Sequence, residues 1–110
     1  MVGEATLAAK IDAPPAELTD QEPGAPLRIE EPARPPELAI VGARQARVPP
    51  IIGYPDPHQR ARILHALANH EFQAAELFAW AIIAFPDTPA AFRRGLLSIL
   101  VDEQRHFRLY

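Results

Sequence analysis

The sequence predicts an all-α protein: an antiparallel helical hairpin over residues 58–110, preceded by a Pro-rich extended arm over residues 1–57. Two observations lead to this prediction. Eleven of the thirteen prolines precede residue 58, and each removes a backbone donor and disfavours helix at the residue before it. Beyond that point only Pro86 and Pro89 interrupt two stretches that are rich in the strong helix formers Ala and Leu.

The arm allows two interpretations from sequence alone. Its proline content, together with nine acidic against five basic residues, is compatible with a disordered chain. Short apolar clusters such as residues 38–41 could instead let the arm lie along the helices as a strap. The sequence favours neither interpretation over the other.

The helix ends are predicted from capping residues. Asp56 is expected to cap the first helix, which then runs over residues 58–85 after a proline at its first position. Thr88 is expected to cap the second helix, which continues to the last residue. Because the connection over residues 85–89 is so short, the two helices should be antiparallel neighbours.

Each predicted helix carries a seam, a row of side chains at alternating spacings of three and four residues through which one helix packs on another. The seam of the first helix comprises Leu64, Leu67, Glu71, Ala74, Phe78, Ala81 and Phe85, and that of the second comprises Phe92, Leu96, Ile99, Glu103, His106 and Tyr110. Both rows are apolar or aromatic except at three positions. Glu71 interrupts the first seam, and Glu103 and His106 interrupt the second.

These three polar residues should meet at one level of the hairpin. Glu71 lies 15 residues before Pro86 and Glu103 lies 14 residues after Pro89, so each is about 21–23 Å from the turn. His106 follows Glu103 by three residues and shares its helix face. Because a buried carboxylate without a partner is costly or takes up a proton, a bound cation is the simplest explanation for the cluster.

A Glu on one helix facing Glu-x-x-His on its antiparallel neighbour resembles one half of a ferritin-like four-helix bundle. More narrowly, the segments ARPPEL (33–38), HALANHEFQAAEL (65–77), FPDTPAAF (85–92) and DEQRHF (102–107) resemble a bacterial ferritin-like family known as domain of unknown function, family 455. The resemblance covers about residues 30–110.

The resemblance implies a two-metal site of iron or manganese in the complete bundle, with Glu71, Glu103 and His106 among its ligands. Glu103 would bridge or chelate, Glu71 would be a terminal or bridging carboxylate, and His106 would bind through one ring nitrogen. Such ligands suit iron and manganese, and open positions on the metals would permit O₂ activation or redox cycling. An oxidoreductase or hydroxylase-type function is therefore expected of the complete fold.

A complete bundle would repeat this ligand set, but the sequence contains it once. We therefore expect either a fragment that lacks the C-terminal half of the bundle or a homodimer in which two copies complete it. The absence of a C-cap signal near Tyr110 favours the fragment. An alternative without metal is a dimerisation or scaffold module whose buried polar residues set the helix register.

Two other titratable residues near the seam are not expected to be ligands. Glu76 is about 140° around the helix from Glu71, which predicts a solvated or structural position. His70 adjoins Glu71, but a single His at the edge of a seam is more often packed or hydrogen-bonded than a ligand.

The composition excludes several classes of protein. The formal charge is −3 and no basic run is present, so nucleic-acid binding is not expected. No apolar stretch approaches the ~20 residues of a membrane span, and Glu4 lies where a secretory signal would be apolar, so a cytoplasmic location without a membrane partner is expected. The absence of Cys leaves only His, Asp and Glu as metal ligands.

Overall fold

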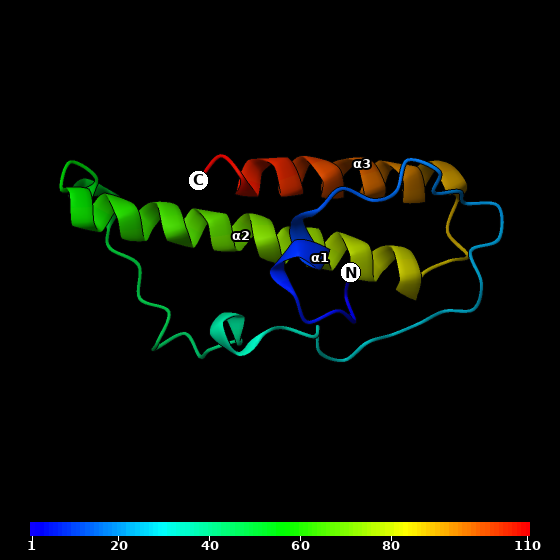
Figure 1. Cartoon of the computed structure of the whole chain (residues 1–110), viewed down its shortest axis with the longest axis horizontal. Coiled ribbons are helices and arrows are strands. Elements are labelled where there is room, and N and C mark those ends of the chain that lie inside the picture. The colour runs from blue at the N-terminus through cyan, green and yellow to red at the C-terminus, as the bar shows by residue number, and fades with distance from the viewer.

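A computed structural model describes residues 1–110 and contains helices joined by irregular segments. The elements are α1 (Leu7–Ile11), η1 (Pro36–Leu38), η2 (Ile51–Gly53), α2 (Pro57–Ala84) and α3 (Ala90–Phe107), where η denotes a short 3₁₀ turn. The long helices α2 and α3 pack together in opposite directions, which confirms the predicted all-α helical hairpin (Figure 1). None of the helices combines the length and the apolar character needed to cross a bilayer.

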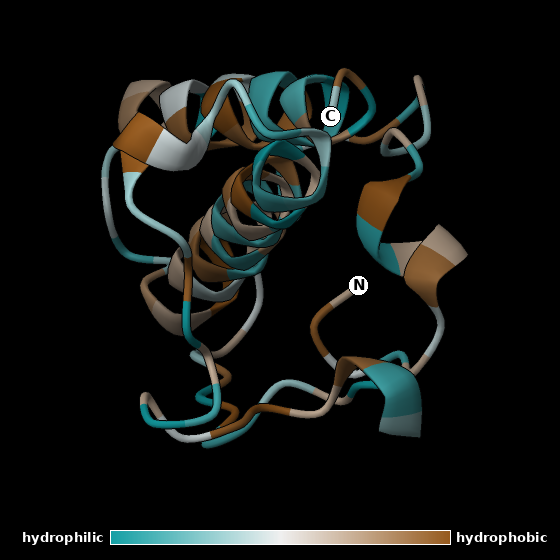
Figure 2. Ribbon diagram, turned by 90° about the vertical axis from the view of Figure 1, so that its left-hand side faces the viewer, coloured by the Kyte–Doolittle hydropathy of each residue, from teal (hydrophilic) through white to brown (hydrophobic).

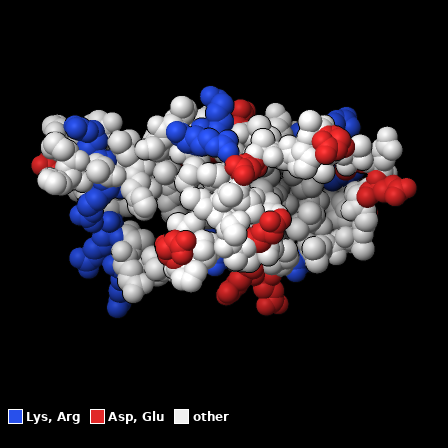
Figure 3. All heavy atoms as spheres, in the orientation of Figure 1, with Lys and Arg blue, Asp and Glu red and all other residues white.

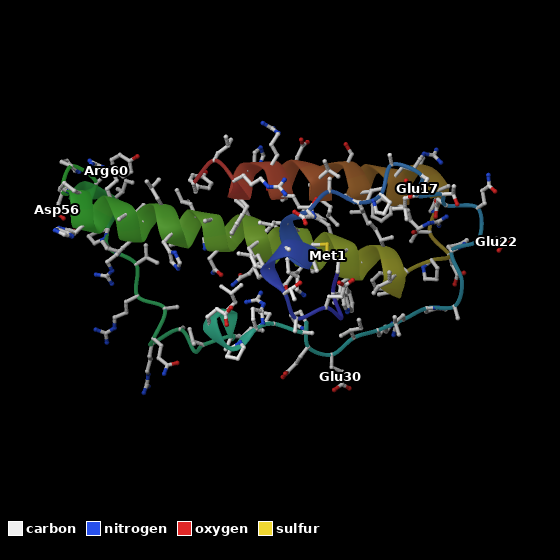
Figure 4. The ribbon with its side chains drawn as sticks, in the orientation of Figure 1. Met1, Glu17, Glu22, Glu30, Asp56 and Arg60 are labelled. Atoms are coloured by element: carbon white, nitrogen blue, oxygen red, sulfur yellow. The ribbon has the colours of Figure 1, made fainter.

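The start of α2 follows the prediction. The carboxylate of Asp56 accepts a hydrogen bond from the backbone N–H of Gln59 at 2.8 Å, and Pro57 occupies the first turn. Arg60 donates to the Tyr54 carbonyl at 3.3 Å and thereby ties the incoming chain to the helix. Figure 4 shows Asp56 and Arg60 together at this end of the molecule.

The turn between the helices differs from the prediction at the cap. Pro89, not Thr88, is the N-cap of α3, and the Thr88 hydroxyl instead donates back to the Phe85 carbonyl at 2.8 Å. The turn is instead stabilised by Arg93, which donates to the carbonyls of Pro86 and Thr88. The predicted end of the second helix was also wrong by a few residues. The helix α3 ends at Phe107 and does not continue to the last residue.

The arm lies along the hairpin as a strap. It is not wholly extended as predicted, because Thr6 caps the short helix α1 through a bond from the Ala9 N–H, and two 3₁₀ turns follow. The predicted contact cluster at residues 38–41 is not the anchor, since Ile40 and Val41 are exposed. In Figure 2, with α3 above α2, the arm begins on the right of the two helices, passes below them and rises on the left to the start of α2.

Backbone groups of the arm bond directly to the long helices. The Trp80 indole N–H donates to the Ile29 carbonyl at 2.8 Å, and the Leu27 N–H donates to the Ile83 carbonyl at 2.9 Å. On the other side, the buried Gln104 amide donates to two carbonyls at the end of α1, those of Lys10 and Asp12. Backbone groups of the arm lose contact with water where the arm packs on the helices, and these bonds give them new partners.

Glu76 lies inside the molecule, so it occupies the structural one of the two predicted positions and does not face solvent. Its Oε1 pairs with Nζ of the fully buried Lys10 at 3.1 Å, and Nε of Arg34 donates to its Oε2 at 3.1 Å. The Arg34 guanidinium also stacks over the Phe72 ring, 4.8 Å from its centroid. Glu76 does point away from Glu71 as predicted, but the arm rather than water covers that side of α2.

Along α3 and in the middle of α2, the core is rotated by one residue from the predicted seams, whereas Ile63 and Ala84 near the ends of α2 are buried one residue before a seam position. The buried residues Phe72 and Ala75 follow seam positions of α2, and the buried residues Arg93, Leu100 and Gln104 follow seam positions of α3. One residue corresponds to about 100° of helix rotation. The most buried stripe of each helix therefore faces the arm, and the predicted seams are left partly exposed.

Charges are dispersed over the surface. Figure 3 shows acidic side chains spread over the arm and α3, while basic side chains gather at the left, where α2 begins. Glu30 points outward from the arm, and Glu17 and Glu22 lie toward the end of the hairpin where α2 and α3 are joined (Figure 4).

Candidate metal centre

Three side chains from the two long helices converge near the middle of α2. Each of Glu71, Glu103 and His106 offers a ligand atom, and these atoms lie within 4.8 Å of one another. Nδ1 of His106 is 3.2 Å from Oε2 of Glu103 and 3.9 Å from Oε2 of Glu71. The structure thus brings together the three residues that the seam pattern singled out. The side chains are partly exposed, at 21% for Glu71, 19% for Glu103 and 39% for His106.

The donor atoms fit a single transition-metal ion. With bonds of about 2.1 Å from carboxylate oxygen or imidazole nitrogen, ligand atoms of one ion lie between about 3.0 Å apart, for adjacent octahedral positions, and about 4.2 Å apart, for opposite ones. The distances of 3.2 Å and 3.9 Å to the His106 nitrogen fall within that range. Two hard carboxylates and one imidazole form a donor set suited to iron or manganese.

Glu71 and Glu103 shift each other's pKa in opposite directions. A hydrogen bond with Glu103, together with partial burial and the negative charge of Glu103, raises the pKa of Glu71 above its ordinary value. The same hydrogen bond lowers the pKa of Glu103, and the contact with His106 lowers it further. Of the two carboxylates, Glu71 therefore holds a proton more tightly, and a cation bound there would compete with that proton.

His106 is hydrogen-bonded on both ring nitrogens. Nδ1 faces Glu103, while Nε2 is 3.2 Å from the guanidinium of Arg105. Because Arg105 can only donate, this contact favours the tautomer whose proton is on Nδ1. Coordination through Nδ1 requires the proton to move to Nε2, so the exposed Arg105 side chain would have to turn toward Asp102, with which it already pairs at 3.7 Å.

The remaining titratable residues lie outside the cluster. His58, His65 and His70 are exposed and contribute no ligand atom. The buried network of Glu76 with Lys10 and Arg34 was missed from the sequence, and it is a structural contact between arm and hairpin. A signal for it was present, because Ala68, Phe72, Ala75, Ala79 and Ile83 form a second apolar stripe on α2 beside Glu76.

A family model described as "Protein of unknown function (DUF455)" matches residues 4–110. The chain belongs to the DUF455 family. No curated protein and no solved structure matches it. The DUF455 match includes both the strap and the hairpin, so the arm belongs to the region that characterises the family.

Proposed function

We propose that this DUF455 chain carries half of a ferritin-like di-metal carboxylate centre, with Glu71, Glu103 and His106 as ligands of iron or manganese. The observation that carries the proposal is the convergence of these donors from facing helices within 4.8 Å. In ferritin-like bundles each half contributes a Glu from one helix and a Glu-x-x-His from another. We propose an oxidoreductase or hydroxylase-type activity for the completed bundle.

The charge balance of the cluster supports a cation. Inside the same hairpin, the carboxylate of Glu76 is compensated by Lys10 and Arg34. Glu71 and Glu103 have no Lys or Arg partner, and their only cationic neighbour within 4.0 Å is His106 when it is protonated. A protein that needed these carboxylates only for packing could pair them as it pairs Glu76. A divalent ion would supply the missing positive charge.

Each of the three ligand residues has a defined role in this proposal. Glu103 and Glu71 would hold the metal through carboxylate oxygens, and His106 would add a nitrogen ligand that fixes the ion near α3. When bound, iron or manganese would supply redox chemistry at open coordination positions. Phe72 and Phe107, whose ring centroids are 6.0 Å apart, pack beside the ligands and limit the motion of the two helices there.

Metal content tests the proposal directly. The purified chain is loaded either with Fe(II) under anaerobic conditions or with Mn(II). It is then desalted, and its metal content is measured by inductively coupled plasma mass spectrometry. Glu103→Ala and His106→Ala should lose the metal. The controls Asp102→Ala and His65→Ala should retain it, because they remove an exposed carboxylate of α3 and an exposed imidazole of α2 that lie outside the cluster.

Equal metal content in the wild type and in both ligand variants would contradict the proposal. If the chain also assembled identically with and without chelator, the scaffold interpretation of the hairpin would be favoured instead.

A further inference from the structure

We infer that the end of the molecule where α2 begins is a peripheral contact surface for an anionic membrane. This surface, called the basic end, consists of the side chains of Arg44, Arg47, Ile51, Ile52, Arg60 and Arg62. It lies at the opposite end of α2 from the turn that joins α2 to α3 (Figure 1). The inference does not depend on the metal centre.

Positive charge is concentrated at the basic end and is not neutralised there. Four of the eleven cationic side chains of the protein belong to this surface, and none of the four forms an ion pair. Five of the other seven do pair with a carboxylate, namely Lys10, Arg34, Arg93, Arg105 and Arg108. The only acid between residues 38 and 62 is Asp56, whose carboxylate caps α2. A chain of net charge −3 therefore has one positive end, where Figure 3 shows the basic side chains gathered.

Two aliphatic side chains of the basic end project into solvent. Ile51 and Ile52 begin the 3₁₀ turn η2 and are 75% and 85% exposed, the highest values among the large hydrophobic residues of the chain. The turn has a defined shape, because the Gly53 N–H donates to the Pro50 carbonyl at 2.9 Å. Aliphatic side chains at the tip of such a turn can enter the interfacial layer of a bilayer without unfolding the protein.

Hydrogen bonds hold the arginines and isoleucines together as one surface. Nη2 of Arg62, on α2, donates to the carbonyl of Arg47, on the arm, at 3.1 Å. Nη1 of Arg60 donates to the carbonyl of Tyr54, directly after η2, and its guanidinium stacks over the Tyr54 ring, 5.8 Å from the centroid. These carbonyl and ring contacts fix the positions of the guanidinium groups and leave their charges available to an anionic partner.

The combination of positive charge with exposed aliphatic side chains favours an anionic membrane as the partner. Each Lys or Arg near an anionic bilayer strengthens binding about fivefold, and apolar side chains that enter the interface add to it. A nucleic acid would also attract arginines, but single-stranded bases stack on aromatic rings, and the most exposed side chains of this surface are aliphatic.

This inference differs from the expectation that the chain has no membrane partner. That expectation rested on the lack of a spanning segment, which a peripheral contact does not need. It also rested on the lack of a basic run. The four arginines are separated in the sequence, and only the fold brings the arm segment with Arg44 and Arg47 to the start of α2.

Sedimentation of the full chain with lipid vesicles in EDTA tests the inference. We expect binding to vesicles of equal parts phosphatidylcholine and phosphatidylglycerol, weaker binding as salt is added, and no binding to phosphatidylcholine alone. Arg44→Gln combined with Arg47→Gln should weaken binding about 25-fold, or about fivefold for each charge. The matched control combines Arg28→Gln with Arg94→Gln. It removes the same charge from the two other arginines without an ion pair, and it should bind like the wild type.

A second pair of variants tests the apolar contribution. Ile51→Ser combined with Ile52→Ser should weaken binding about tenfold or more, because serine gains nothing from entering the bilayer interface. Leu18→Ser combined with Leu27→Ser is the matched control, since both leucines are exposed on the arm outside the basic end. Circular dichroism of each variant establishes that the helices are retained.

Several outcomes would contradict the inference. They are no sedimentation with the mixed vesicles, equal binding to phosphatidylcholine alone, and control variants that lose as much affinity as the variants of the basic end. Binding to duplex RNA that is lost in the Arg44 and Arg47 variant, without binding to vesicles, would assign the surface to nucleic acid instead. Because the assay contains EDTA, none of these outcomes bears on the metal ligands, and the proposed function keeps its own test.

Discussion

Arg34 and Glu76 are 42 residues apart in the sequence, yet the guanidinium of Arg34 donates to both carboxylate oxygens of Glu76. Lys10 reaches the same carboxylate from another part of the arm. One buried acid on α2 therefore fastens the arm at two places. This contact holds the strap against the side of the hairpin that lies opposite the candidate metal ligands.

Glu76→Ala should destabilise the protein strongly. It leaves Lys10 and Arg34 buried without a counter-charge, and the loss of one partner from a buried ion pair typically costs about 3–5 kcal/mol. The measurement is the free energy of unfolding from urea denaturation. Gln73→Ala, an exposed change one turn away, should remain within about 0.5 kcal/mol of wild type.

The only tryptophan of the chain reports on the same contact. Trp80 donates to the Ile29 carbonyl of the arm, so release of the arm should expose the indole to water and shift its emission to longer wavelength. Glu76→Ala with unchanged stability and unchanged emission would show that the ion pair does not hold the arm.

Arg93 should matter far more than its neighbour Arg94. Arg93 is buried, pairs with Asp20 of the arm at 2.9 Å and donates to the Pro86 carbonyl at 2.6 Å, whereas Arg94 is exposed and forms no ion pair. Arg93→Ala is expected to lower the free energy of unfolding by about 2–3 kcal/mol, because it leaves two turn carbonyls and a partly buried carboxylate without their donor.

Thermal and urea unfolding of Arg93→Ala and Arg94→Ala, measured side by side, check this expectation. Similar losses for the two variants would mean that the clamp on the turn contributes little.

The sequence predicted the hairpin well because its determinants are local. Proline positions, Asp56 as a cap and the Ala- and Leu-rich stretches act within a few residues of where they stand. The sequence also predicted that Glu71 and Glu103 lie at the same height along the hairpin, since the rise per residue is constant and the turn is short. These features do not depend on what else packs against the helices.

The burial of each helix face could not be predicted in the same way. It depends on the arm, whose contacts join residues such as Arg34 and Glu76 across long sequence separations, and the seam pattern considered only two helices. A third layer rotates the core by one residue and buries Glu76. The apolar stripe of Ala68, Ala75 and Ala79 on that side is the local sign that α2 is covered on more than one face.

The stability of the metal-free chain should decrease as the pH rises through the titration of Glu71. The pKa of Glu71 is raised in the folded state, so its stabilising contribution is fully present below the pKa of an unfolded glutamate and is lost as the pH rises through the folded value. The lowered pKa of Glu103 acts in the opposite sense, and its contribution is lost only as the pH falls through its own folded value.

Glu71→Gln removes the titrating group while its amide can still donate to Glu103. In EDTA this variant should lack the decline in stability above the ordinary glutamate pKa and should be more stable than wild type near neutral pH. Urea unfolding across a pH series in EDTA is the measurement. A wild-type profile that rises with pH in this window would contradict the raised pKa of Glu71.

The most direct test of the metal centre is the affinity of the chain for Mn(II), measured by titration with detection of free Mn(II) by electron paramagnetic resonance. The wild type and the isosteric variant Glu103→Gln are compared with Asp102→Asn, which alters the adjacent exposed carboxylate. Because loss of even an outer-shell partner weakens metal sites about 10–100-fold, Glu103→Gln should lose at least that much affinity. Asp102→Asn should bind like wild type. Equal affinities for all three proteins would contradict the assignment of Glu71, Glu103 and His106 as metal ligands.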